Sequence, residues 1–140
     1  MGVGRNILLW CSQNNWMKKN IPKYTFVKRA LKRFMPGERL EDALLESKKF
    51  KEPGIGTVLT HLGENINSMT EAASVTNHYL HVLDKIGEWN TPTEISIKLT
   101  QIGFDLSKEE TKKNFYMLAA KSIEKNNFLW IDMEQSNYVD

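Results

Sequence analysis

Lys98 and Asp132 are the residues of this chain best suited to chemistry, because each interrupts a short apolar stretch. Lys98 lies in Glu94-Ile-Ser-Ile-Lys-Leu-Thr100, and Asp132 lies in Phe128-Leu-Trp-Ile-Asp-Met-Glu134. Side chains alternate between the two faces of a strand, so each charge lies opposite the aliphatic residues of its own strand. A charge among apolar groups is costly unless it is paired. The pattern favours a site, and a Lys98–Asp132 ion pair inside the protein is the alternative.

Three more titratable residues lie at or just after the ends of such stretches. His61 belongs to Thr57-Val-Leu-Thr-His-Leu62 and is expected on the same inward face as Lys98 and Asp132. A histidine satisfied within the core is an equally good interpretation. Glu64 follows in a loop, as a site residue or as a solvated one, and Glu134 closes the third stretch.

The elements that must position these residues alternate along the chain from Gly54 onward. Apolar strands recur about every 35 residues, and a helix follows each of the first two. Ser68-Met-Thr-Glu71 and Ser107-Lys-Glu-Glu110 are capping boxes, in which the serine accepts from a free backbone N–H and the glutamate reaches back to the serine N–H. This alternation predicts right-handed crossovers and a parallel sheet.

Two helical faces are expected behind these caps, and a helical segment is expected before the first strand. Residues 4–52 have apolar residues at helical spacing, interrupted by Pro36-Gly37. We therefore divide the chain into a helical segment, 1–52, and strand–helix units, 53–140. The predicted apolar faces comprise Ala72, Val75, Tyr79, Val82, Leu83 and Ile86 in the first helix, and Phe115, Leu118, Ala119, Ser122 and Ile123 in the second.

Two parallel architectures compete for this pattern. An open doubly wound sheet that binds dinucleotides needs a glycine-rich turn after its first strand, whereas Gly54-Ile-Gly56 precedes the strand here. We therefore predict an α/β fold, the N-terminal part of a (β/α)8 TIM-like barrel preceded by a helical segment. Active sites of such barrels lie at the carboxyl ends of the strands, where the candidate residues are.

Composition and charge limit the classes of partner that the chain is expected to bind. Hydrophobic residues make up 41% and charged residues 26% of the chain, which is typical of a soluble globular protein. Residues 1–37 contain eight basic residues and no acidic one, which indicates either a solvated surface or docking to an anionic membrane. The one cysteine, Cys11, excludes an internal disulfide and fits the cytoplasm. We find no metal-ligand cluster or P-loop and expect no nucleic acid partner.

Three motifs together resemble the short, monofunctional bacterial proline dehydrogenases. They are Gly54-Ile-Gly-Thr-Val-Leu-Thr-His-Leu-Gly-Glu-Asn65, Glu94-Ile-Ser-Ile-Lys-Leu-Thr-Gln101 and Trp130-Ile-Asp-Met-Glu134, and Phe34-Met-Pro-Gly-Glu38 resembles the helical segment that precedes them. The resemblance covers essentially the whole chain. It implies a distorted barrel that binds FAD non-covalently, oxidises L-proline to Δ1-pyrroline-5-carboxylate and passes electrons to a membrane quinone.

The same resemblance implies roles for three residues. Lys98 matches a strand lysine beside the flavin and the proline carboxylate, and Asp132 matches an aspartate beside the substrate and the flavin. Glu64 matches a glutamate that helps to close the substrate site by pairing with an arginine of a late helix. A cation near a flavin stabilises the negative charge that arrives with a hydride. The expected location is the cytoplasm, either free or at the inner face of the cell membrane.

Two alternative functions remain open, and the length of the chain bears on its activity. Lys98 could instead form a Schiff base in an aldolase-like barrel, or the basic segment could be a membrane-docking module without enzymatic activity. A closed barrel needs about 200 residues or more. We therefore expect this 140-residue chain to be the N-terminal portion of the enzyme and to be inactive by itself.

Overall fold

A computed structural model describes residues 14, 20, 24–25, 39–52, 54–63, 66–134 and 138. The chain divides into two compact units, Met1–Ala43 and Leu44–Asp140, and the second contains every described strand. Cys11, Glu64 and most of the basic segment lie outside the described residues. The proposed boundary at residue 52 stays a prediction.

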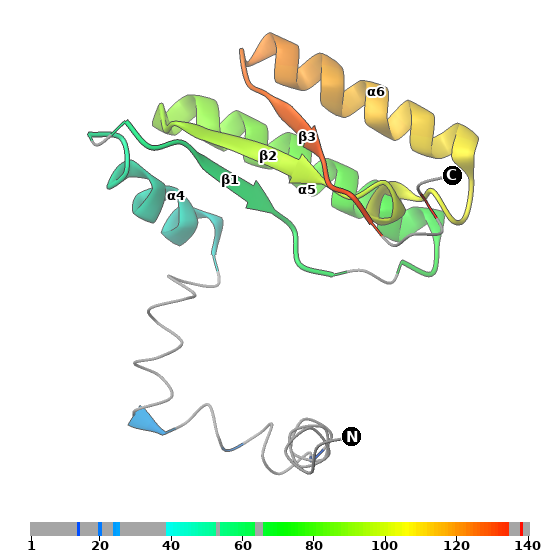
Figure 1. The fold of residues 1–140 in the computed structure, drawn as a ribbon. Helices are drawn as coiled ribbons and strands as arrows, with labels where there is room; N and C mark the ends of the chain where they lie inside the picture. Colours follow the sequence, from blue (N-terminus) through cyan, green and yellow to red (C-terminus); the bar gives the residue numbers. More distant parts are fainter. Residues whose placement is uncertain are drawn as a thin grey trace. The chain divides into compact units, whose positions relative to one another are not determined.

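Three parallel strands form the sheet, in the order β1-β2-β3 (Figure 1). They are β1 (Thr57–Thr60), β2 (Thr93–Ile97) and β3 (Leu129–Ile131). In their register Leu59 pairs with Ile95, and Ile95 pairs with Leu129. The predicted parallel pairing is confirmed. The second strand is shorter than predicted because Leu99 adopts the α-helical conformation and starts a 3-10 turn, η2 (Thr100–Ile102).

The described residues include three α-helices: α4 (Leu40–Lys48), α5 (Met69–Trp89) and α6 (Lys108–Glu124). Helix α5 contacts β2, α6 contacts β3, and the two helices contact each other. They therefore cover the same face of the sheet, with each strand beside the preceding one (Figure 1). An open doubly wound sheet would carry helices on both faces. Sequential strands with helices on one side are the arrangement of the (β/α)8 barrel, as predicted.

Serine side chains begin both long helices as predicted, but the glutamates of the capping boxes act differently. Ser68 Oγ accepts from the Glu71 N–H at 3.2 Å, and Ser107 Oγ accepts from the Glu110 N–H at 3.3 Å. Glu71 accepts from the N–H of Asn67, one residue before the cap, whereas the Glu110 carboxylate pairs with Lys113 at 2.6 Å. A glutamate that finds a lysine one turn away does not need the backbone donor.

The core lies between the sheet and the two helices. Ile95 and Ile97 of β2 are fully buried, as are Leu83 and Leu118 of the helices. This arrangement confirms most of the two predicted helical faces. Ile123 is a correction, because 80% of its surface is exposed. Ser122, on the same last turn of α6, is 3% exposed, so that turn buries Ser122 and exposes Ile123.

The opposite face of the sheet is open in the part of the chain that the structure describes. Val58 of β1 is 53% exposed and Trp130 of β3 is 47% exposed. The Trp130 indole N–H donates to the Glu94 carboxylate at 2.6 Å, across the same face. In a barrel this face points inward. None of the described helices has the length and apolar character needed to cross a membrane.

Candidate functional site

Lys98 and Asp132 occupy neighbouring positions at the carboxyl end of the sheet. Each directly follows its strand, and the residues before them, Ile97 and Ile131, are partners in the register. The Asp132 N–H donates to the Ile97 carbonyl at 2.8 Å, which prolongs the pairing by one step. If the alternation continues past the strand ends, both side chains follow Ser96 and Trp130 onto the open face. The structure thus brings together the two main predicted site residues.

The two charges differ in their surroundings. Lys98 is half-buried, and Asp132 is exposed. None of the ion pairs between described residues joins Lys98 to Asp132. The structure therefore does not support the alternative in which these two residues form an ion pair inside the protein. The two strand ends thus place an exposed carboxylate beside a partly buried ammonium.

His61 faces the helices, which corrects the prediction that it points inward with Lys98 and Asp132. Its ring lies 5.1 Å from the ring of His78 and 6.4 Å from that of Tyr79, both on α5. Leu59, two residues earlier, pairs with buried Ile95 on the helix-covered face. The period-2 pattern does not identify the inward face of β1, because that strand has apolar residues on both faces. This correction does not change the positions of Lys98 and Asp132 at their strand ends.

The histidine pair has an electrostatic consequence. Burial, and then the nearby imidazoles of His61 and His81, lower the pKa of His78 from its usual value near 6.5. A neighbouring positive charge would repel the imidazolium form of His78, so the neutral form of His78 is favoured. His61 Nδ1 is buried and has no hydrogen-bond partner among the described groups. Three-residue groups suited to hold a metal ion do not occur among the described His, Cys, Asp and Glu.

Glu134, predicted at a strand end, binds the segment after β2 instead of projecting toward a ligand. Its two carboxylate oxygens accept from the Thr100 N–H, at 3.1 Å, and from the Thr100 hydroxyl, by a short contact. Thr100 is 8% exposed. This two-point contact joins the chain after β3 to the turn that begins two residues after Lys98.

Sequence reasoning missed a second buried contact, between Tyr79 and Gln101. The helical pattern predicts Tyr79 only as part of an apolar face, and no motif gives Gln101 a role, yet the two side chains are 2% and 1% exposed. The Tyr79 hydroxyl accepts from the His61 N–H at 2.9 Å and faces Gln101 Oε1 at 3.2 Å. A tyrosine hydroxyl in a buried helical stripe needs a partner, and that was the available signal. We call Tyr79, Thr100, Gln101 and Glu134 the strand-end cluster.

Two hollows lie near this end of the sheet. The larger, of about 320 Å³, is bounded by Phe104 and Phe115 on the α6 side and by Ile131 of β3, and its lining is almost wholly apolar. Lys98 and Asp132 do not line it. The smaller, of about 90 Å³, includes Asp132 and Glu134. Chemistry is therefore expected at the smaller hollow and the open face beside it.

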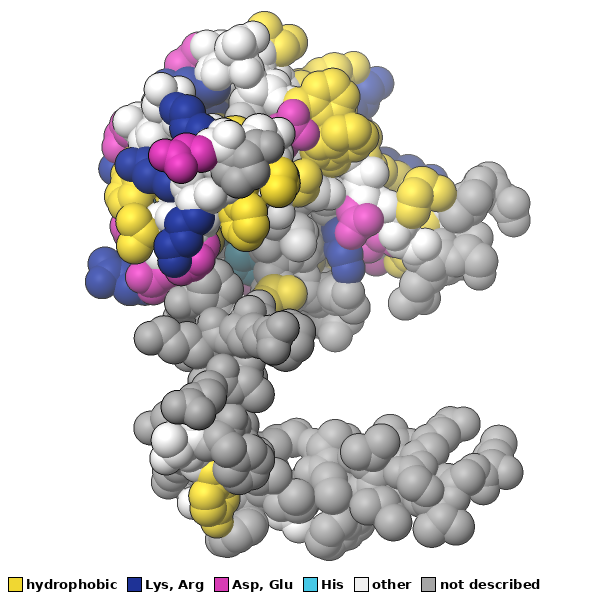
Figure 2. Space-filling view, turned by 60° about the vertical axis from the view of Figure 1, so that its left-hand side comes forward, with side chains coloured by type: hydrophobic (Ala, Val, Ile, Leu, Met, Phe, Trp, Pro, Cys, Tyr) yellow, Lys and Arg dark blue, Asp and Glu magenta, His cyan; other side chains and the backbone are white. Residues whose placement is uncertain are grey.

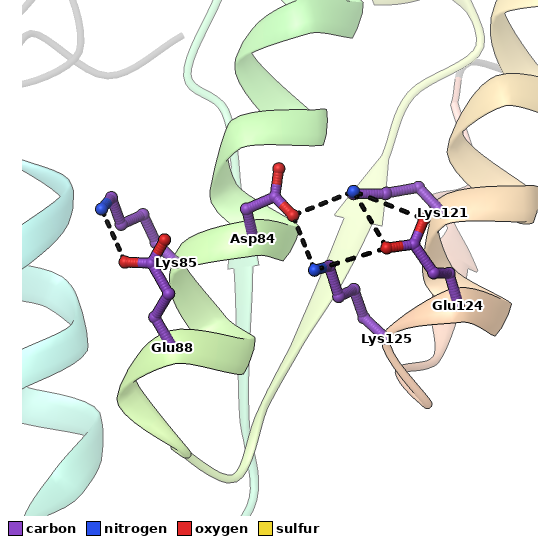
Figure 3. A network of polar contacts seen from close by, with 6 residues as sticks. All are labelled: Asp84, Lys85, Glu88, Lys121, Glu124 and Lys125. Atoms are coloured by element: carbon purple, nitrogen blue, oxygen red, sulfur yellow. Dashed lines mark hydrogen bonds and ion pairs between the residues drawn. The ribbon is translucent and has the colours of Figure 1, made fainter.

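A different polar group joins the far ends of the two helices (Figure 3). Asp84 of α5 accepts from Lys121 and Lys125 of the α6 end, each at 2.9 Å, and both lysines also approach Glu124. We call these four residues the helix-end network. Hydrogen bonds from Lys125 and then Lys121 lower the pKa of Asp84 to about 2. These helix ends lie toward the amino ends of the strands. In barrels, residues at that end contribute to stability, and the active site lies at the opposite end.

Comparison with known proteins agrees with this architecture. The chain is 28% identical over 136 residues to proline dehydrogenase 1 of Bacillus subtilis strain 168, a match that covers 97% of this chain and 45% of that protein. It is 20% identical over 132 residues to proline dehydrogenase 2 of the same strain, covering 94% and 43%. The chain thus spans about half the length of the curated relatives it matches.

The fold also matches a solved structure, and a family model matches most of the chain. Proline utilization A from Bdellovibrio bacteriovorus superposes with a TM-score of 0.62 at 21% identity, over 94% of this chain and 19% of that one. The likeness supports the barrel-type fold. The model of the family "proline dehydrogenase" matches residues 43–140, which include all three strands and both candidate charges. This chain belongs to the proline dehydrogenase family.

Proposed function

We propose that this chain supplies the first strand–helix units of an FAD-dependent enzyme that oxidises L-proline to Δ1-pyrroline-5-carboxylate. The observation that carries the proposal is the position of Lys98 and Asp132, side by side at the carboxyl ends of β2 and β3 within the segment that matches the family. Residues 53–140 are the proposed barrel units, and 1–52 the proposed helical lead. Family membership also makes an oxidoreductase better supported than a Schiff-base aldolase.

The residues present fit a flavin and an amino-acid substrate. Partly exposed Val58 and Trp130 give the open face an apolar surface of the kind on which a planar ring system packs. Lys98 is a cation at the rim of this surface, suited to an anionic group. FAD, when bound, accepts the hydride that leaves the proline ring. The donor set of this chain therefore agrees with the cofactor that the family uses.

Each residue of this chain has a separate task in the proposal. Lys98 holds the proline carboxylate and stabilises negative charge that develops beside it, because a fixed charge at a partly buried position needs no reorganisation during the reaction. Asp132 would carry a negative charge next to the substrate and stabilise the positive charge that develops on the ring nitrogen of the neutral amine as the hydride leaves. Glu64 helps to close the substrate site. That role derives from the family resemblance, since Glu64 lies outside the described residues.

Purification of the complete protein tests the proposal. We expect a yellow protein whose flavin absorbance bleaches when L-proline is added without oxygen, and which does not retain substrate after borohydride reduction. A colourless protein, or covalent trapping of a carbonyl substrate on Lys98, would overturn the dehydrogenase assignment in favour of the aldolase alternative.

We also propose that electrons pass to a membrane quinone and that the protein lies in the cytoplasm, at the inner face of the cell membrane. Eight basic residues and no acidic one within residues 1–37 support weak attraction to anionic lipid. Vesicles that contain anionic lipid should sediment the protein at low salt and release it as salt rises. Equal binding to neutral vesicles would contradict an electrostatic contact.

A further inference from the structure

Hydrogen bonds hold the end of β2 and the segment after it, which carries Lys98, on both sides. Tyr79 of α5 bonds to Ser96 and Gln101, Gln101 bonds to the end of β1, and the partly buried Glu134 after β3 bonds to Thr100. We propose that the strand-end cluster, with Tyr79 and Gln101 at its centre, positions Lys98 for the proposed reaction. The expected effect on catalysis rests on the proposed function. The restraint of the segment that carries Lys98 rests on the contacts alone.

Tyr79 connects three parts of the chain through one hydroxyl group. Its oxygen accepts from the His61 N–H, and its single proton is shared between the Ser96 carbonyl at 3.0 Å and Gln101 Oε1 at 3.2 Å. Ser96 lies two residues before Lys98. A helix residue thereby holds the ends of β1 and β2 at a fixed separation, in a place that water does not reach.

Gln101 completes the connection and can do so in one orientation only. Its Nε2 donates to the His61 carbonyl at 2.8 Å and, by a short contact, to the Gly63 carbonyl. Two carbonyl acceptors require the NH2 group there, so Oε1 must face the Tyr79 hydroxyl. The Gln101 backbone N–H also donates to the Lys98 carbonyl at 3.1 Å. Gln101 thus ties the end of β1 directly to the backbone of Lys98.

The β3 side restrains the same segment. Glu134 accepts twice from Thr100, and the Asp132 N–H donates to the Ile97 carbonyl at 2.8 Å. Lys98 is therefore flanked on both sides by residues whose backbone groups are bound. Misplacement of a reacting group by about 1 Å can cost on the order of a hundredfold in rate. The hydrogen bonds of Tyr79 and Gln101 join neutral, buried side chains, so we expect them to hold this position independently of salt and of pH near neutrality.

Tyr79→Phe is the decisive variant, because it removes the hydroxyl and keeps the ring in the core. Tyr116→Phe is the matched control, the same chemical change at a tyrosine of α6 that is 59% exposed. Hydrogen–deuterium exchange on the full chain measures whether the strand ends are restrained. In Tyr79→Phe we expect the amides of His61 and Gln101 to exchange about tenfold faster or more, with the amides of α6 unchanged. Exchange identical to that of Tyr116→Phe would overturn the proposal.

Flavin reduction by proline in the FAD-loaded complete enzyme reads the functional part. In Tyr79→Phe and in Gln101→Met we expect a fall of about tenfold in kcat, with flavin content unchanged and with KM for proline less affected. Faster exchange with unaltered kcat would overturn the positioning role. A wild-type protein that proline does not reduce would refute the proposed function, while the exchange data would still decide whether Tyr79 holds this segment. Tyr79→Phe suffices if Gln101→Met does not fold.

Discussion

The strand-end cluster and the helix-end network are both polar groups that join neighbouring strand–helix units, but their central residues differ in burial and charge. Tyr79 and Gln101 are almost completely buried and neutral. Lys121 and Glu124 are charged, with 22% and 60% of their side chains exposed. Figure 2 shows acidic and basic side chains interspersed over the surface on this side of the described part.

This difference determines whether a polar group fixes the positions of its atoms or only adds a little stability. Buried hydrogen bonds between short or rigid groups fix atoms in place, and a partner left without its bond is costly. Exposed ion pairs between long side chains contribute little and are screened by salt. We therefore expect changes near the strand-end cluster to alter chemistry and changes in the helix-end network to alter stability slightly.

The largest expected effect is at Lys98. In the complete enzyme, Lys98→Met should slow flavin reduction by proline about a hundredfold, because one fixed charge beside the reacting groups is lost. Lys121→Met is the matched control, the same substitution in the helix-end network, and it should keep near wild-type kinetics. Stopped-flow absorbance measures both. Equal rates in the two variants would remove Lys98 from the site.

Asp132 should follow, with an effect on catalysis larger than its effect on stability. Asp132→Ala is expected to lower kcat/KM for proline at least about tenfold, because the substrate loses a nearby negative charge. Its side chain is exposed, so the melting temperature should change little. Asp84→Ala provides the converse control, with altered stability and retained activity. A variant of Asp132 that melts much earlier but is fully active when folded would show a structural carboxylate.

Gly103, which ends the turn of the strand-end cluster, should be sensitive to a single methyl group. Its φ is +112°, and an added Cβ would lie 2.8 Å from Met69 Cε. Gly103→Ala is expected to cost about 1–3 kcal/mol in the free energy of unfolding, measured in urea. Gly54→Ala tests the backbone contribution alone, since Gly54 has a φ of +74° and open space around its Cβ position. The loss at Gly103 should be the larger of the two.

The smallest effect concerns pH and the helix-end network. The folded pKa of Asp84, about 2, is below its unfolded value near 3.9, so the ionised carboxylate stabilises the fold above pH 4. That contribution is lost as the pH falls from 4 toward 2. The melting temperature of Asp84→Asn should therefore lie below that of the wild type at pH 6, by less than about 3 °C, and approach it near pH 2. A difference independent of pH would contradict this assignment.

Neighbouring residues determined much of what could be predicted from the sequence. The serine caps at Ser68 and Ser107 depend on contacts within one helical turn, and both form. The strands and their parallel order follow from periodicity and spacing. The placement of Lys98 and Asp132 at neighbouring strand ends follows from the same repeat, because equal strand–helix units bring equivalent positions together.

Tertiary contacts decided the rest. Whether His61 faced the barrel or the helices depended on which apolar face of β1 the helices cover, and a period-2 pattern with apolar residues on both faces leaves that open. The pairing of Asp84 with Lys121 and of Glu134 with Thr100 joins residues more than thirty positions apart. Sequence by itself determined local elements and their order, because these depend on short-range geometry; which polar groups meet was decided only when the packed elements brought distant side chains together.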